Sequence, residues 1–334
     1  MGVAETERLS ELIAGAALSH AICSIAELGV ADQIVAGTPQ PVKKLAQATG
    51  AHERSLYRVM RYMASHGLFR ETGNREFDHT PLSAALRKDA PGSFRSAGLM
   101  FHIMKTAWPS LHHSLLTSKP GFDEVFRQPL FEYIGAHPEL PAIFDAGMTS
   151  FHGHETAAML DAYDFGGVET VADIGGGNGS LISAVLRRYP NMKGILFDLG
   201  HVVARSKARL GAEGLSDRCT IVEGSFFDSV PKGADAYVLR HIIHDWTDEQ
   251  SIQILKNVRS AIPEHGRVLL VEFAVPAANQ PGLGKDTDMI MMVFTGGLER
   301  TEAEYGSLFA RAGFRLHKVT PTASAVSVVE GRPV

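Results

Sequence analysis

A glycine-rich stretch near the middle of the chain holds the first residues whose types and spacing predict chemistry. β-branched and small apolar residues lead to Asp173, and glycines then alternate at Gly175, Gly177 and Gly179. Glycine serves where the backbone turns with φ > 0, or where a ligand lies against bare main chain. The first amides of a following helix would point at that ligand. The stretch therefore predicts a strand, a tight turn and a helix that bind a nucleotide-like molecule.

The spacing separates two kinds of nucleotide site. The dinucleotide fingerprint is G-x-G-x-x-G, whereas here the third alternating glycine comes one residue early and an acid precedes the first by two residues. This D-x-G-x-G-x-G pattern resembles motif I of S-adenosylmethionine (SAM)-dependent methyltransferases. An ordinary glycine-rich turn between a strand and a helix is the alternative interpretation.

Polar residues at the ends of the next two predicted strands suit the rest of such a ligand. Asp198 follows the first glycine by about 20 residues, where an acid accepts hydrogen bonds from ribose hydroxyls. Its alternative role is a helix N-cap before His201. In the segment Glu223–Asp228, Ser225 stands beside Phe226, and a hydroxyl next to an aromatic ring suits the amino edge and the face of adenine.

Two histidines, His241 and His244, follow the fourth predicted strand. A phenol has a pKa of about 10 and must lose its proton to become a good nucleophile. Histidine, with an ordinary pKa of about 6.5, is the natural base near neutral pH. By composition either histidine qualifies as that base, and the alternative role of His241 is a packed, hydrogen-bonded structural residue.

Three segments carry a closer resemblance. Arg240–Gln250, which reads RHIIHDWTDEQ, resembles the H-D-W-x-D-E signature of the plant-type small-molecule O-methyltransferases. That family includes the caffeate and hydroxyindole methyltransferases and many bacterial antibiotic-tailoring enzymes. Gly296–Thr301 resembles its G-G-x-E-R-T segment, and Asp288–Met292 resembles the preceding D-x-x-M-L stretch. The resemblance covers essentially the whole chain.

The resemblance implies SAM as the cofactor and His244 as the general base, with Glu272 and Glu299 as the acids that orient it. The alternative role of Glu272 is a buried strand-end acid satisfied by backbone amides, and that of Glu299 is a salt bridge with Arg300. Together with the motifs above, the expected cofactor-binding residues are Asp173, Gly175, Gly177, Asp198, Ser225, Phe226 and Arg240.

Two departures from the family pattern stand out. Ser225 occupies the position where the family commonly has an acid that contacts adenine, and Arg240 replaces the Lys of many plant members. We expect Arg240 to hold the polar edge of the cofactor, or alternatively to pair with Asp198 or Asp228. The acids do not cluster with metal-ligand spacing, so we expect no metal cofactor.

Alternating strands and helices from about residue 168 predict a doubly wound α/β sheet with an antiparallel last strand. The expected helices are 179–189, 201–211, 248–262 and 301–312. The expected strands are Thr170–Ile174, Lys193–Asp198, Cys219–Glu223, Ala234–Leu239, Arg267–Glu272, 314–320 and 324–330. Ligands on such sheets bind at the carboxyl ends of the strands.

The preceding half is predicted to be helical. Residues 8–36 resemble two short helices, and residues 42–77 follow a helix–turn–helix–hairpin order that is typical of a winged helix. Arg54, Arg58 and Arg61 on its second helix suit either DNA or a solvated face. By the resemblance, this region forms a homodimer and does not bind nucleic acid.

Residues 80–160 are rich in aromatic residues and Met, most of which we expect in the core. Some would line a flat, apolar acceptor pocket, with members from other segments: Trp108, Phe144, Met148, His152, Asp245, Met289 and Met292. The expected regions are a dimerisation region at 1–90, a helical substrate-lid or linker region at 91–165 and a SAM-binding catalytic domain at 166–334.

Composition sets limits on function. The chain has 334 residues, of which 45% are hydrophobic, and a net charge of −5, which gives no general attraction to nucleic acid or anionic membranes. Its two cysteines lie far apart and no secretory signal is evident, so we expect a cytoplasmic protein. The apolar stretch Leu12–Val35 is interrupted by charged residues, so we do not expect it to span a membrane.

These observations favour a SAM-dependent O-methyltransferase that acts on a hydroxyl of a small phenolic or polyketide-like aromatic metabolite, without a metal. Two alternatives stay open. The same scaffold suits N- or C-methylation or another SAM-dependent reaction, and the winged unit suits a metabolite-sensing DNA-binding regulator.

Overall fold

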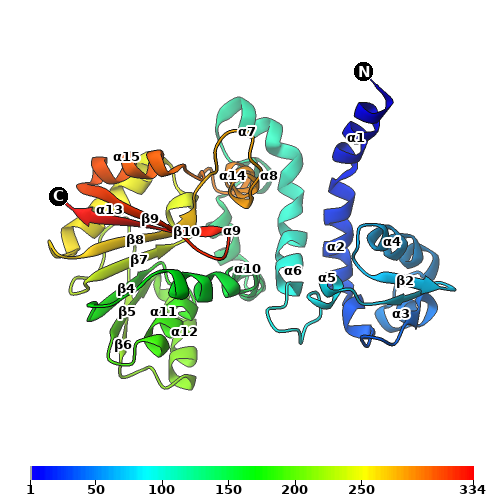
Figure 1. The fold of residues 1–334 in the computed structure, drawn as a ribbon, viewed down its shortest axis with the longest axis horizontal. Helices are drawn as coiled ribbons and strands as arrows, with labels where there is room; N and C mark the ends of the chain where they lie inside the picture. The colour runs from blue at the N-terminus through cyan, green and yellow to red at the C-terminus, as the bar shows by residue number, and fades with distance from the viewer. Residues whose placement is uncertain (1) are drawn as a thin grey trace. The chain divides into compact units, whose positions relative to one another are not determined.

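The computed structural model describes residues 2–334 and divides into two compact units (Figure 1). The first unit comprises Met1–Thr106 and His137–Phe151, and the second comprises Ala107–Ala136 and His152–Val334. The boundary falls inside one long helix, α10 (Leu140–Ala162). The three regions expected from the sequence stay a prediction.

The second unit contains a seven-stranded sheet in the order β6-β5-β4-β7-β8-β10-β9. β4 to β8 pair in parallel, whereas β10 is antiparallel to both β8 and β9, which confirms the doubly wound sheet with an antiparallel last strand. The strands are β4 (Thr170–Ile174), β5 (Lys193–Asp198), β6 (Cys219–Glu223), β7 (Ala236–Arg240), β8 (Arg267–Phe273), β9 (Phe314–Pro321) and β10 (Val326–Pro333).

Helices cover both faces of this sheet (Figure 1). Side chains of α13 and α15 pack on one face with Ala172 and Ile174, and side chains of α11 and α12 pack on the other with Val171. Successive side chains of β4 therefore point to opposite faces of the sheet, and both faces are buried. The helices are η2 (Lys105–Ser110), α7 (Leu111–Thr117), α8 (Gly121–Phe126), α9 (Leu130–Ala136), α11 (Ser180–Arg188), α12 (Gly200–Ala212), η3 (Ile243–Asp245), α13 (Asp248–Ala261), α14 (Leu283–Phe294) and α15 (Glu302–Ala312).

Helix α14 was not among the helices expected from the sequence. Asp288–Met292 had been interpreted only as a family motif, yet it lies within this helix. The buried residues Met291 and Phe294 are three positions apart, a helical spacing that the run of apolar residues around them obscures.

Parallel pairing brings the candidate site together at one edge of the sheet. Asp198 at the end of β5 is in register with Glu223 at the end of β6, and Arg240 at the end of β7 with Val271 of β8. The turns that follow β4, β5, β6, β7 and β8 therefore share the carboxyl edge, where ligands of doubly wound sheets bind.

The first unit has its own core, built around a small sheet in the order β1-β3-β2. Helices α3 and α4 pack on it, and the hairpin β2–β3 follows them, as expected from residues 42–77. Arg54, Arg58 and Arg61 on α4 are exposed. The elements are α1 (Val3–Ala14), α2 (Ala16–Leu28), η1 (Val30–Gln33), β1 (Gln40–Pro41), α3 (Val42–Thr49), α4 (Glu53–Ser65), β2 (Arg70–Gly73), β3 (Glu76–Asp78), α5 (Pro81–Ala84) and α6 (Arg95–Met104).

The N-terminal helical stretch Val3–Leu28 is long and apolar enough to cross a membrane by length and composition alone, with a mean hydropathy of 1.5. Within α1, Leu9, Leu12 and Ile13 are exposed in the single chain. Such a stretch also suits a helix that is covered by another protein surface. That it does not span a membrane stays a prediction.

Candidate active site

The glycine-rich turn after β4 exposes main chain. Gly175, Gly177 and Gly179 have φ values of 70°, 58° and 77°, a left-handed conformation that favours glycine. A Cβ on Gly175 would collide with the Ile242 side chain, whereas a Cβ on Gly177 would meet no atom within 4 Å. The backbone of Gly177 is thus open on the side where a ligand would approach it.

Two acids support this turn. Asp173 is only 2% exposed, its Oδ2 has no hydrogen-bond partner, and burial raises its pKa to about 6. Asp198 accepts hydrogen bonds from the Gly177 amide at 2.9 Å and the Leu199 amide at 2.7 Å. Helix α12 has no side-chain cap, so the alternative role of Asp198 as its N-cap is wrong. Instead Asp198 fixes the position of the open glycine.

The turn after β6 places its aromatic residue beside the glycine turn. Phe226 lies 3.6 Å from the position that a Cβ on Gly175 would take, and its ring centroid lies 6.0 Å from that of Trp246. The Oγ of Ser225 accepts a hydrogen bond from the Phe227 amide at 3.2 Å. The flat face of the Phe226 ring and the hydroxyl of Ser225 thus both lie at the carboxyl edge of the sheet.

Arg240 ends β7 and links neighbouring helices. Its guanidinium donates to the Thr156 hydroxyl at 2.6 Å and to the Ser180 hydroxyl at 3.4 Å. The alternative of a pairing with Asp198 or Asp228 is therefore not what the structure shows. The charge of Arg240 acts on the buried carboxyl of Asp173 and lowers its pKa in opposition to burial.

The turn η3 after β7 carries His244 and is held by a buried carboxylate. Glu272 Oε1 on β8 accepts hydrogen bonds from the amides of Ile242 at 3.1 Å and Ile243 at 2.9 Å. The His244 carbonyl accepts from the Leu298 amide at 2.9 Å. The position of the His244 backbone is thus fixed from two sides.

The His244 imidazole faces three acids. Its Nδ1 lies 2.6 Å from Glu299 Oε1 and 3.7 Å from Glu272 Oε2, and its Nε2 lies 3.8 Å from Asp245 Oδ1. Glu272 therefore fits both roles expected of it, since Oε1 binds backbone amides while Oε2 faces the imidazole. The alternative of a Glu299–Arg300 salt bridge is wrong, because Arg300 pairs with Asp248.

Burial and charge compete at these groups. Burial alone would lower the pKa of His244, but the carboxylates of Glu272, Glu299 and Asp245 outweigh it and raise that pKa to about 10. Burial, reinforced by the charge of Glu299, raises the pKa of Glu272 to about 8. Burial raises the pKa of Asp245 to about 6. The pKa values of His244, Glu272 and Asp245 thus depend on the charges of their neighbours.

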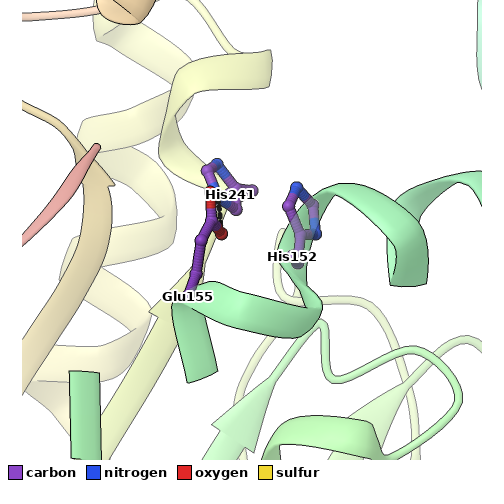
Figure 2. A group of neighbouring side chains, drawn as sticks. All are labelled: His152, Glu155 and His241. Carbon is purple, nitrogen blue, oxygen red and sulfur yellow. Dashed lines mark hydrogen bonds and ion pairs between the residues drawn. The ribbon is translucent and has the colours of Figure 1, made fainter. Parts of the chain in front are cut away.

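The neighbouring His241 lies in a second buried pair (Figure 2). Its φ of 52° is left-handed, and its Nε2 lies 2.8 Å from Glu155 Oε2. Its ring stacks on that of His152, with centroids 4.0 Å apart and planes 13° apart. This is the packed, hydrogen-bonded residue that was one of its two expected roles. Glu155 was missed, although its spacing from His152 puts both on one face of α10.

His152, Glu155 and His241 have the composition of a divalent-metal site, with one possible ligand atom each within 4.8 Å of the others. Their ring geometry does not suit one. The lone pair of an imidazole lies in the ring plane, so two stacked rings with planes only 13° apart aim their lone pairs almost in parallel. As they lie, the two imidazoles do not converge on a single ion.

The residues expected in the acceptor pocket fall in both units. Trp108 packs edge-on against Phe294 of α14, with ring centroids 5.7 Å apart, and the same helix carries the half-buried Met289 and Met292. Within the second unit His152 and Asp245 lie beside His241 and His244, respectively. Phe144 and Met148 belong to the first unit, and their place in a pocket stays a prediction.

Arg300 was considered from the sequence only as a salt-bridge partner of Glu299, yet it organises the turn η3. Its guanidinium is fully buried and donates to the carbonyls of Ile243, Trp246 and Leu298 at 3.0–3.3 Å, and to Asp248 at 2.9 Å. A side chain at the nearby Gly297 would collide with the His244 carbonyl. These contacts explain why a glycine and an arginine flank Glu299.

Comparison with known proteins identifies two family domains in the chain. Residues 108–315 match the O-methyltransferase domain family, and residues 10–89 match the O-methyltransferase dimerisation domain. This chain belongs to the O-methyltransferase family.

Its relatives act in the biosynthesis of small molecules. A phenazine O-methyltransferase from Lysobacter antibioticus is 42% identical over 98% of this chain and 96% of its own length. A mitomycin biosynthesis 6-O-methyltransferase from Streptomyces lavendulae is 34% identical over 98% of this chain and 95% of its own. A solved O-methyltransferase from neocarzinostatin biosynthesis, in complex with SAM and 2-hydroxy-5-methyl naphthoic acid, is 33% identical with a TM-score of 0.83, covering 95% of this chain and 96% of its own.

We predict that Arg300→Met lowers the free energy of unfolding by about 3 kcal/mol or more, because three buried carbonyls lose their donor and Asp248 loses its partner. Urea unfolding followed by circular dichroism measures this change. Arg311→Met is the matched control, since Arg311 and Glu249 form an exposed pair 4.0 Å apart. We expect that control to change stability by less than about 0.5 kcal/mol. Equal losses in both variants would refute the role of Arg300.

Proposed function

We propose that this protein is a SAM-dependent O-methyltransferase that methylates a hydroxyl of a small phenolic or polyketide-like aromatic metabolite, with His244 as general base and without a metal. The observation that carries the proposal is the 2.6 Å contact between His244 Nδ1 and Glu299 Oε1. It lies in a turn whose Ile242 side chain packs against the cofactor-type glycine Gly175.

The His244–Glu299 contact defines which nitrogen does the chemistry. A carboxylate only accepts hydrogen bonds, so in the neutral imidazole Nδ1 donates to Glu299 and Nε2 keeps its lone pair. Nε2 is then the atom that takes the proton from the acceptor hydroxyl. Glu299 fixes the ring and the tautomer, and Glu272 fixes the backbone of the turn. This arrangement generates a phenolate where it is needed.

The residues at the sheet edge fit SAM. The bare backbone of Gly177 and the unpartnered Oδ2 of Asp173 offer a surface and an acceptor to a polar, positively charged ligand. In the proposed complex Asp198 binds the ribose, Ser225 and Phe226 hold the adenine, and Arg240 lies near the polar edge of the cofactor. When bound, SAM supplies the methyl group as an electrophile attached to a sulfonium.

The acceptor would lie against the apolar surface of α14. The contacts there come from the flexible side chains of Met289 and Met292 and the flat ring of Trp108, and His152 and Asp245 belong to the same proposed pocket. Such a surface favours an aromatic ring and excludes water from the reacting hydroxyl.

The N-terminal region suits a homodimer rather than a DNA complex. We infer that the exposed apolar residues of α1 and α2 are covered by a second copy of the chain, as expected of a dimerisation domain. By this proposal the winged-helix arrangement is a packing unit, the arginines of α4 form a solvated face, and the enzyme works in the cytoplasm.

We predict that His244→Ala lowers kcat by about 10²–10⁴-fold, the contribution of a general base. Steady-state kinetics with a panel of phenols, naphthols and hydroxylated phenazines tests it, with His265→Ala as the control because His265 lies in an exposed ion pair. Acceptors whose hydroxyl is already ionised at the assay pH should lose less. Wild-type rates in His244→Ala on an ordinary phenol would exclude the proposed base.

We predict that kcat/KM rises with pH, by roughly tenfold per unit at most, between pH 7 and about 10. The sign follows from the chemistry: His244 must be unprotonated to accept a proton, and its pKa is raised to about 10. Glu299→Gln removes a carboxylate that raises this pKa, so the rise should occur at lower pH and with a smaller maximum. If the rise of kcat/KM occurs at the same pH in Glu299→Gln as in the wild type, His244 is not the base that Glu299 orients.

We predict that Gly177→Ala weakens binding of S-adenosylhomocysteine at least tenfold, because the added methyl group enters the open side of the turn. Calorimetric titration measures the affinity. Gly214→Ala is a matched control, since Gly214 also has positive φ, at 68°, and open space around it, but lies after α12. Both variants should lose about 1 kcal/mol of stability to the left-handed backbone. Equal affinities would show that the turn does not bind the cofactor.

A further inference from the structure

We propose that Glu155 and His241 form a second buried carboxylate–imidazole pair, which positions Glu272 and passes a proton to and from its carboxylate. The inference rests on the proposed function, because it assigns a role to Glu272 beside the base His244. Glu155 and His241 are then positioning residues, since neither is proposed to touch the reacting atoms.

Two unsatisfied atoms carry the argument. Glu272 Oε2 and His241 Nδ1 are both buried without a hydrogen-bond partner, and they lie 3.8 Å apart. A buried polar atom without a partner is unfavourable, so a small movement that joins these two is favourable. The same Oε2 lies 3.7 Å from His244 Nδ1. Oε2 thus stands between two imidazoles.

The other side of His241 is already paired. Its Nε2 lies 2.8 Å from Glu155 Oε2, and both side chains are at most 5% exposed (Figure 2). Stacking on His152 holds the ring plane. The left-handed φ of His241 directs the side chain away from the usual course of a strand, and such backbone strain is most often found at functional sites.

Two coupled proton shifts connect the three groups, and together they carry one net proton between Glu155 and Glu272. In one form, protonated Glu155 donates to Nε2, and Nδ1–H donates to the Glu272 carboxylate. In the other, Nε2–H donates to the Glu155 carboxylate, and protonated Glu272 donates to Nδ1. Conversion between them moves one proton from Glu155 to Nε2 and one from Nδ1 to Glu272, so charge and hydrogen count balance and His241 stays neutral throughout.

The position of that proton decides the charge beside His244. When Nδ1–H of His241 donates to Glu272, the carboxylate is stabilised and favours a proton on His244. When Glu272 holds the proton, His244 gives its own up more readily. The pair thereby sets how readily His244 releases its proton. The other titratable or charged groups that face these three side chains are His152, Arg240, His244, Glu299 and Tyr305.

His241→Phe tests the proposal, since it keeps a ring against His152 and removes both nitrogens. Glu272 then loses a hydrogen-bond donor and stays protonated to higher pH. A neutral Glu272 stabilises the protonated form of His244 less than a carboxylate does. We expect kcat to fall about tenfold, less than for a general base, and the rising limb of kcat/KM to move to lower pH by at least about 0.5 unit. KM values should change less than about twofold.

Glu155→Gln supplies the second half of a double-mutant cycle. Alone it should lower kcat about tenfold, and added to His241→Phe it should lower kcat no further, because both act through one proton. His265→Asn is the control, since it removes an exposed His–acid pair. Additive losses, or a fall in kcat with the pH limb unmoved, would overturn the relay. If His241→Phe does not fold, His241→Asn replaces it, since Asn tolerates positive φ.

A nuclear magnetic resonance titration separates this inference from the proposed function. The pKa of the His244 imidazole, read from its ¹⁵N shifts in the ligand-free full-length protein, should be lower in His241→Phe than in the wild type. An unchanged pKa refutes the relay whether or not the protein is active. Absence of methyl transfer by the wild type to the phenol panel, with that pKa difference present, refutes the proposed function alone.

Discussion

The carboxylate of Glu272 is the constraint on which the site depends. Its side chain is fully buried, and a buried carboxylate is costly unless its oxygens have donors. One oxygen takes the Ile242 and Ile243 amides, and this fixes the turn in which His244 lies. The other faces two imidazoles. The same requirement, that a buried charge be satisfied, therefore shapes both the backbone of the turn and its electrostatics.

A second set of contacts completes the turn from the opposite side. Arg300 binds its carbonyls, and Gly297 lets the chain after α14 approach His244 closely enough for Glu299 to reach Nδ1. The acid, the glycine and the arginine are close neighbours in sequence. One short segment therefore orients the imidazole, leaves room for the His244 carbonyl and binds the carbonyls of the turn. The glycine turn after β4 meets this structure through Ile242, which joins the proposed cofactor site to the proposed base.

The sequence was most informative where local pattern determines structure. Alternating strands and helices predicted the sheet, because strand and helix periods are local, and the parallel order then placed Asp198 and Arg240 at one edge. It was least informative where contact joins distant segments. Glu155 meets His241 only because α10 passes beside the end of β7, 86 residues away, and the residue type of His241 does not by itself specify its left-handed backbone. The role of Arg300 and the helix α14 were missed for related reasons, since burial of a charge and the period of an all-apolar run depend on the neighbours.

The place of β10 in the sheet has a consequence for biosynthesis. β10 lies between β8 and β9, and its Ser327 is in register with Glu272. Until this strand has been made, one side of β8 is an open edge, and the acid beside the base is not enclosed. Because β10 follows every residue of the proposed site in the sequence, β8 gains this neighbour only after all of those residues have been made. The enclosure of Glu272 is therefore the last step in building the site.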